Sequence, residues 1–300
     1  MSGSSYLGEM LAIASAMAWA VGVVLFRQAG RSVHPLALNF FKNSLSLILL
    51  FLTSFAANRV LIGHLSDRDV YLLLAAGFVG MGISDTFMLA SLNRLGAGLS
   101  SILWTLYTPM VIGLSVIFLG ERLTVVQFVG VLAVMTALVL VVSINNGKGP
   151  RDSKSYWVGV LWALAAMLFQ AVSVVGIKPA LERTPIFVAT ELRLMGGLMF
   201  LLPVLYFRRD RGELFRSILR PSNLKFLLPG SIAGTYLALT LMLGGVKYTL
   251  ASTATVLNQT SNLFIFLLAI LFLRETAGVR RVVGIILGVA GAVLVTLGGS

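Results

Sequence analysis

The sequence predicts an all-α, polytopic membrane protein with ten transmembrane helices arranged as two inverted five-helix repeats. Three observations predict this fold: the composition, ten apolar runs of membrane length, and a motif that recurs at a fixed offset. Of the 300 residues, 58% are hydrophobic and only 11% are charged. A soluble domain carries roughly twice this share of charged residues and could not bury so much hydrocarbon. The sequence therefore indicates that the solvent of this protein is lipid.

A helix needs about 20 predominantly apolar residues to cross the hydrocarbon core of a bilayer. Ten such runs follow one another, and short connections join most of them. They cover residues 6–28, 34–57, 69–92, 97–119, 124–143, 156–178, 186–207, 222–246, 250–273 and 277–298. The first run lacks a preceding basic stretch and an evident cleavage site, so we interpret it as a retained helix rather than a signal peptide.

A connection rich in Gly, Pro, Asn and Ser lies at the midpoint of the chain. It predicts a first repeat over 1–145, a linker over 146–155 and a second repeat over 156–300. The segment Phe-Leu-Gly-Glu-Arg that contains Glu121 recurs as Phe-Leu-Arg-Glu-Thr around Glu275. Each half holds five spans, an odd number, so the second half is expected to enter the membrane inverted relative to the first.

The loop Leu-Gly-Glu-Arg, which follows a run with a central Pro109, and its second copy Leu-Arg-Glu-Thr resemble the EamA domain. Two such domains in one chain are similar to the ten-helix members of the drug/metabolite transporter superfamily, and the resemblance covers essentially the whole chain. The second copy departs from the pattern, since Arg274 replaces the glycine and Leu263 stands at the position of Pro109. The resemblance implies a carrier for small metabolites, often an exporter, with substrates that range from amino acids to nucleotide sugars.

Two polar faces fall at matched positions of the repeats. Polar residues within membrane helices usually face the bundle interior or a water-filled cavity. The ninth run carries Ser252, Thr255, Asn258, Gln259 and Asn262 at helical spacing, and the fourth run carries Ser101, Trp104, Thr105 and Thr108. We expect both faces to line one substrate cavity at the repeat interface. The alternative is that these side chains only hold neighbouring helices together.

Ionisable residues also fall within the second and seventh runs. Asn39, Lys42 and Asn43 share one face of the second run, and Glu191 and Arg193 lie at similar depth in the seventh. We expect Lys42 and Arg193 to bind a substrate carboxylate, with Asn39 and Asn43 beside them, and Glu191 to bind a coupling proton. The alternatives are snorkelling to the interface and a fixed ion pair that braces the bundle.

Asp85, in the third run, is a second candidate for proton coupling. Trp19 and Gln170 stand at matched positions of the first and sixth runs. They complete the expected substrate-binding set, because a Trp in a cavity offers a flat apolar wall and one donor. Their alternative role is ordinary packing.

Other motifs have structural interpretations. Glu121 and Glu275 are expected to accept backbone N–H groups at a helix start, and Thr124 with Gln127 reads as a capping box. Gly284, Gly288 and Ala292 form a ridge of small residues that predicts close helix contact, within the chain or between protomers. The expected bending points are Pro109, Gly80, Gly82, Gly230 and Gly234.

The sequence lacks the zinc-protease, hydrolase-elbow and Walker motifs. It has no cysteine and only two histidines, His34 and His64. We therefore expect a protein that is not an enzyme, with no cofactor, no metal and no nucleic-acid partner. Its expected partners are the lipid bilayer and a small-molecule substrate, and its expected state is a monomer or weak homodimer in the inner (plasma) membrane.

These features predict a secondary active transporter of small amphipathic metabolites, an amino acid or similar zwitterion, that works by alternating access in the direction of efflux. A passive facilitator or channel stays open as an alternative, as does a carrier of a sugar phosphate, a nucleotide sugar or a drug-like substrate. The loops that follow odd-numbered spans hold 15 basic residues and the opposite loops hold six. The positive-inside rule then predicts termini outside the cell, whereas members of the resembled family are commonly drawn with cytoplasmic termini.

Overall fold

The computed structural model describes residues 6–30, 32–56, 65–88, 90–91, 103, 106–142, 153–261, 263–264 and 279–298. Within these ranges the regular elements are all helical, which confirms the predicted fold class. The first half contains α1 (Leu7–Ala29), α2 (Pro35–Ala56), α3 (Asp67–Gly77), the π-helical η2 (Phe78–Ser84), α5 (Tyr107–Leu119) and α6 (Val125–Val142). The second half contains α7 (Ser153–Arg183), α8 (Ile186–Tyr206), α9 (Arg211–Leu219), α10 (Pro221–Ser231), the π-helical η4 (Ile232–Leu237), α11 (Ala238–Tyr248), α12 (Ala251–Asn258) and α14 (Val279–Leu297).

Six helical stretches in the described ranges are long and apolar enough to cross a membrane. They correspond to the predicted spans one, two, three, six, seven and eight. Shorter apolar helices lie within the predicted spans four, five and ten, and α12 begins the ninth. The predicted count of ten spans is compatible with this arrangement and stays a prediction.

Local sequence signals explain where several helices begin and end. Pro35 and Pro221 are the first residues of α2 and α10, where the missing N–H of proline has no intrahelical partner to lose. The Ser66 side chain accepts a hydrogen bond from the Asp69 backbone N at the start of α3. Gly120 ends α5 with a φ of 67°, a left-handed conformation that favours glycine.

The expected capping box is present at the start of α6. The backbone N of Thr124 donates to Gln127 Oε1 at 3.0 Å, and the backbone N of Gln127 donates to Thr124 Oγ1 at 3.2 Å. Each side chain therefore satisfies an otherwise unpaired N–H of the helix terminus, as the sequence pattern predicts.

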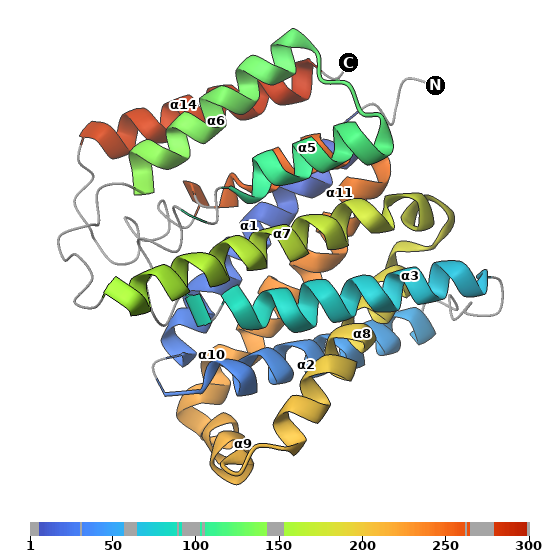
Figure 1. Ribbon diagram of the computed structural model, residues 1–300, viewed down its shortest axis with the longest axis vertical. Coiled ribbons are helices and arrows are strands. Elements are labelled where there is room, and N and C mark those ends of the chain that lie inside the picture. Colours follow the sequence, from blue (N-terminus) through green and yellow to red (C-terminus); the bar gives the residue numbers. More distant parts are fainter. Residues whose placement is uncertain are drawn as a thin grey trace.

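Two helix boundaries differ from the sequence prediction. α7 continues to Arg183 with Pro179 inside it, five residues beyond the expected end. The expected connection 208–221 contains the additional helix α9, which projects at the lower edge of the molecule in Figure 1. Leu214 and Ile218 of α9 are buried in an apolar cluster with Leu205 and Leu227, so packing of this apolar face stabilises a helix of only nine residues.

The two halves interlock in a symmetric way. α2 packs against α8, α5 against α12, and α6 lies beside α14 along the upper edge of Figure 1. α3 and η2 pack against α7 and α8, and in the same way α10 and η4 pack against α1 and α2. Exchanging the halves therefore maps each of these contacts onto a counterpart, as expected for two repeats related by a two-fold axis.

The π-helical segments occupy matched places in the two halves. They include the expected bending points Gly80, Gly82 and Gly234. A Cβ at Gly234 would lie 2.8 Å from Gly22 Cα in α1, and a Cβ at Gly80 would lie 2.5 Å from Ser173 Oγ in α7. Glycine therefore permits a close interhelical approach at the equivalent crossing in each half.

Small residues also hold α14 against α6. A Cβ at Gly291 would meet the carbonyl oxygen of Gly130 at 2.8 Å, and a Cβ at Gly288 would meet Leu263 and Ala137. The small-residue ridge of α14 therefore makes an intrachain contact at Gly288, and Gly291, which the predicted ridge omitted, takes part in it.

Large apolar side chains cover much of the outer surface. Ile117, Phe118, Val125 and Ile286 are all more than 60% exposed. Exposed apolar area on this scale is incompatible with water and suits contact with lipid tails.

Candidate functional site

A buried ion pair lies between α2 and the end of η2. Lys42 Nζ lies 3.0 Å from Asp85 Oδ2, and their side chains are 8% and 15% exposed. Lys42 occupies the second turn of α2, on the face that is predicted to line the cavity. The pairing agrees with the ion-pair interpretation of Lys42 and gives Asp85 a defined partner.

Two asparagines extend this polar layer along α2. Lys42 Nζ donates to Asn43 Oδ1 at 3.4 Å, and Asn43 Nδ2 donates to Asn39 Oδ1 at 3.4 Å. Asn39 Nδ2 donates to the backbone oxygen of Met81 in η2 at 3.2 Å. Helical spacing on α2 and the altered backbone of η2 therefore bring three predicted site residues into one network.

Arg193 lies in the middle of α8 and is 1% exposed. Its Nη2 donates to Ser173 Oγ of α7 at 2.9 Å, and Ser173 Oγ donates to the backbone oxygen of Ala76 at 2.8 Å. One turn further along α8, a Cβ at Gly197 would lie 3.6 Å from Asn43 Nδ2, which belongs to the network of Lys42. The guanidinium therefore belongs to the same interior region as the Lys42–Asp85 pair.

Several buried polar atoms have no hydrogen-bond partner in the part of the chain that the structure describes. They include Arg193 Nε, Gln170 Oε1, Thr108 Oγ1 and Thr255 Oγ1. All four belong to residues that the sequence predicts to bind substrate. Because buried polar atoms in proteins are almost always paired, these atoms indicate where water or a polar ligand would find partners.

The described parts of the predicted fourth and ninth spans are in contact. α5 packs against α12, and Thr108 of α5 and Thr255 of α12 are both fully buried. At the end of α12, Asn258 Nδ2 donates to Ser15 Oγ of α1 at 2.9 Å. Ser15 Oγ in turn donates to the backbone oxygen of Ala238 at 2.7 Å. The polar face of α12 thus contacts the interior surface of α1.

Glu191 is buried separately from the cationic residues. Its Oε1 accepts a hydrogen bond of 2.6 Å from Ser54 Oγ near the end of α2. Glu191 and Arg193 are two residues apart, about 200° around the helix, so the two side chains leave α8 in different directions. In the described structure the carboxylate therefore faces Ser54 rather than Arg193.

The remaining predicted site residues fall into two groups. Trp19, Gln170 and Gln259 are described and are half-buried. The others lie outside the described residues, namely Ser101, Trp104, Thr105 and Asn262, together with the turn residue Glu275.

Glu121 makes three contacts at the start of α12. Its carboxylate accepts hydrogen bonds from the backbone N of Ala251 at 2.8 Å, from the backbone N of Ser252 at 3.2 Å and from Ser252 Oγ at 2.6 Å. The helix that it caps belongs to the other half of the chain and is not the helix that follows Glu121. Ser252 is consequently bound to Glu121, at the end of the polar face of α12.

Polar contacts also tie together the helix ends at the side where α1 begins. Glu9 Oε1 accepts from Thr249 Oγ1 at 2.6 Å, and Lys247 Nζ donates to the backbone oxygen of Thr184 at 2.6 Å. Lys178 Nζ donates to the backbone oxygens of Val246 and Thr249. Since α1, α7, α8, α11 and α12 all begin or end here, these contacts join both halves at one end of the bundle.

Serines that the sequence prediction did not select turn out to orient the predicted residues. Ser173 holds Arg193, Ser15 holds Asn258 and Ser54 holds Glu191. Each serine shares a helix face with a predicted residue, which is the one signal that the sequence offered. Ser173 follows Gln170 by three residues, Ser15 precedes Trp19 by four, and Ser54 follows Asn43 by eleven.

Chemically, the two buried cations of the described interior differ in their partners. Lys42 is paired with Asp85, whereas no ion pair of Arg193 with an acid is present within the described residues. A carboxylate or another anionic group is the ligand that such a site would stabilise, because a buried unpaired cation is strongly unfavourable. The described residues contain no group of acidic or histidine side chains that could hold a metal ion.

A duplicated all-helical bundle with an apolar exterior and polar, charged residues in its interior defines a polytopic membrane protein. The sequence profile of the EamA-like transporter family matches residues 6–143 and again residues 157–297. The chain belongs to the EamA-like transporter family, as its sequence motifs indicate.

Named relatives agree with this family. The chain is 32% identical over 136 residues to the uncharacterized transporter YetK of Bacillus subtilis (strain 168), a match that covers 45% of this chain and 40% of YetK. It is 24% identical over 291 residues to an uncharacterized transporter of Archaeoglobus fulgidus, which covers 96% of this chain and 97% of that protein. A solved structure titled "Crystal structure of protein" has a TM-score of 0.81, covers 97% of both chains and shares 17% identity, which shows a common fold.

Proposed function

We propose that the protein is a secondary active transporter of small amphipathic metabolites that carry a carboxylate, with amino acids and similar zwitterions as the first candidates. It works by alternating access in the inner membrane and moves its substrate outward. The two repeats interlock around the interior polar region, so a tilt of one half against the other exposes that region to alternate sides.

One observation carries this proposal: the buried guanidinium of Arg193 has an unpartnered Nε and makes no ion pair with an acid among the described residues. An arginine can bind a carboxylate through two parallel N–H groups, which adds geometric selectivity to charge attraction. The neighbouring Lys42–Asp85 pair offers one donor and one acceptor for the amino end of a zwitterion. Glu191, held by Ser54, is the proposed proton-binding group.

Uptake into proteoliposomes tests the proposal. A panel of labelled amino acids is expected to give saturable uptake with counterflow, and Arg193→Gln is expected to reduce the rate by about tenfold or more, since one charge-assisted contact is lost. Arg193→Lys keeps the charge without the planar fork and is expected to retain part of the rate. Arg68→Gln, which changes an exposed arginine at a helix start, is the matched control.

Two outcomes would contradict the proposal. Parental uptake by Arg193→Gln, in protein that elutes as a single species and melts like the parent, would exclude Arg193 as a substrate ligand. Flux that neither saturates nor shows counterflow would instead indicate a passive facilitator.

A further inference from the structure

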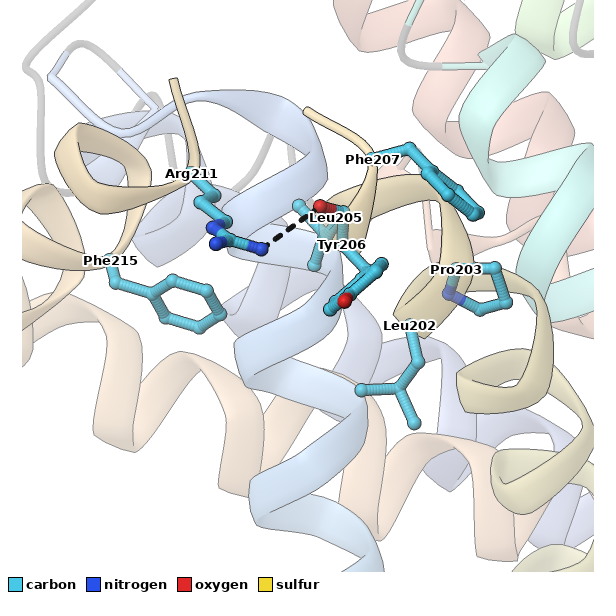
Figure 2. Close-up of a pocket in the computed structure, with 7 residues that line it drawn as sticks. All are labelled: Leu202, Pro203, Leu205, Tyr206, Phe207, Arg211 and Phe215. Atoms are coloured by element: carbon cyan, nitrogen blue, oxygen red, sulfur yellow. Dashed lines mark hydrogen bonds between the residues drawn. The ribbon is translucent and has the colours of Figure 1, made fainter. Parts of the chain in front are cut away.

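A large apolar groove lies at the junction of α8 and α9, away from the interior polar region. It has a volume of about 570 Å³, within the range of about 300–1,000 Å³ that is typical of ligand sites. Its walls are Leu202, Pro203, Leu205, Tyr206, Phe207, Arg211 and Phe215, and Figure 2 shows them around a common opening. Phe207 is 82% and Tyr206 is 68% exposed, so the groove opens to the exterior of the bundle.

A second apolar groove adjoins the first. It has a volume of about 220 Å³ and lies between α2 and α9, where it is lined by Phe40, Phe41, Ser44, Leu45, Ile48, Phe215, Ile218 and Leu219. Phe215 borders both grooves, and its ring packs edge-to-face against Phe40 with centroids 5.6 Å apart. Two neighbouring apolar grooves therefore border α9, and the side chain of Phe215 is the wall that they share.

Arg211 is the charged residue that lines the larger groove. Its Nη1 donates to the backbone oxygen of Tyr206 at 3.1 Å, and its guanidinium lies 5.3 Å from the centre of the Tyr206 ring. This is the one hydrogen bond that Arg211 makes within the described ranges. Since a guanidinium has five N–H donors, Arg211 is held in place yet keeps donors for an anion.

The segment around α9 is strongly basic. Residues 208–225 contain six Lys and Arg residues and two acids, Asp210 and Glu213. Arg208 and Asp210 neutralise each other, because the Arg208 guanidinium donates to both carboxylate oxygens at 2.7 Å and lowers the pKa of Asp210. The exposed basic residues that remain include Arg209, Arg211, Arg216, Arg220 and Lys225.

We propose that the two grooves beside α9 form a binding site for one anionic diacyl phospholipid, with an acyl chain on each side of Phe215 and the headgroup phosphate on Arg211. Two apolar grooves with a shared wall match the two acyl chains of a phospholipid. The basic rim matches its negative headgroup, as in other basic sites at membrane surfaces. The aromatic residues Tyr206 and Phe207, at the end of α8, place the groove at the level of the membrane interface.

Native mass spectrometry of the full-length protein tests this site. Phosphatidylglycerol and phosphatidylcholine with identical acyl chains are offered in equal amounts. The parent is expected to retain phosphatidylglycerol in preference by about tenfold. Both lipids offer a phosphate to Arg211, but the choline cation of phosphatidylcholine is repelled by the guanidinium and offsets this attraction. Arg211→Gln is expected to remove the preference, and Phe215→Ala is expected to weaken retention of both lipids.

Two matched variants distinguish a defined site from diffuse attraction. Arg209→Gln removes an exposed charge two residues from Arg211 that does not line the groove, and Arg68→Gln removes one at a distant helix start. Both are expected to keep the parental preference, and an excess of inorganic phosphate is expected not to displace the lipid.

Three results would each overturn the proposal. The parent could retain the two lipids equally, or the preference for phosphatidylglycerol could survive Arg211→Gln. The preference could also fall as much in Arg209→Gln as in Arg211→Gln. A melting temperature of lipid-free Arg211→Gln equal to that of the parent establishes that the variant is folded. Because the readout is lipid retention, the result does not depend on the transported substrate.

Discussion

At the scale of a residue, Lys42 and Asp85 show how two buried charges compensate each other in a membrane protein. Each side chain is at least 85% buried, and the two charged atoms lie 3.0 Å apart. Either charge alone in that environment is strongly unfavourable, whereas the pair compensates much of its own desolvation. The pair therefore stabilises the fold only while both members are present.

Removal of one member is consequently expected to destabilise the protein more than removal of both. Lys42→Met or Asp85→Asn leaves an uncompensated buried charge, which costs about 3 kcal/mol. The double variant Lys42→Met with Asp85→Asn leaves none and is expected to recover most of the loss. Melting temperatures in one detergent measure this, and a loss in the double variant equal to the sum of the two single losses would show that the pair carries no mutual stabilisation.

The same residues show what sequence reasoning can and cannot provide. The depth of Lys42 and Arg193 follows from counting residues along apolar runs, because an α-helix rises about 1.5 Å per residue. Their partners do not follow from such counting. Asp85 and Ser173 meet them across helix contacts whose rotation depends on packing, and the position of a serine on a helix face does not identify its partner on another helix.

At the scale of an element, Glu121 shows how one side chain caps a helix that is distant in the sequence. It follows α5 but its carboxylate caps α12, which begins 130 residues later. Helix starts expose unpaired N–H groups and a partial positive charge, so a buried carboxylate is well suited to satisfy them. The cap joins one half of the molecule to the other.

We expect Glu121→Ala to lower the free energy of unfolding by about 2–3 kcal/mol, since charge-assisted hydrogen bonds to a buried helix start are lost. Glu121→Gln keeps one acceptor oxygen and is expected to lose less. Glu275, the matched residue of the second half, is expected to show the same order between Ala and Gln. Thermal unfolding measures all four variants, and indifference to Glu275→Ala would contradict an equivalent role for the repeat mate.

Helix positions are predictable from the sequence to the extent that apolar runs and terminators define them. Pro35 and Gly120 mark ends that the structure reproduces. Two features are harder to predict. The π-helical backbone of η2 and η4 depends on close contact with another helix at Gly80 and Gly234, and α9 forms because Leu214 and Ile218 find an apolar surface made by α2, α8 and α10.

At the scale of the whole molecule, the exchange symmetry of the contacts links duplication to function. α2 with α8, α5 with α12 and α6 with α14 each pair equivalent spans of the two halves. At these pairs equivalent spans of the two halves meet. Residues on those faces, including Glu191 of α8 and Thr255 of α12, therefore lie at the boundary along which one half is expected to move against the other.

The distribution of basic residues predicts how this bundle is oriented. The loops on the side of α9 hold 15 basic residues against six on the opposite side, where α1 begins. Basic loops are retained in the cytoplasm, so the side of α9 is expected to be cytoplasmic and the side of Asp67 external. Because the chain has no cysteine, single-cysteine variants report accessibility without background.

Gly212→Cys and Asp67→Cys form the test pair, since both positions are exposed at opposite ends of the bundle. A Cβ at Gly212 meets nothing within 4 Å, so this substitution is not expected to disturb the fold. A membrane-impermeant maleimide on intact cells is expected to label Asp67→Cys and to label Gly212→Cys only after permeabilisation. The reverse pattern would place the termini in the cytoplasm, as resembled proteins are drawn, and would show that the net balance of loop charge does not decide the topology of this chain.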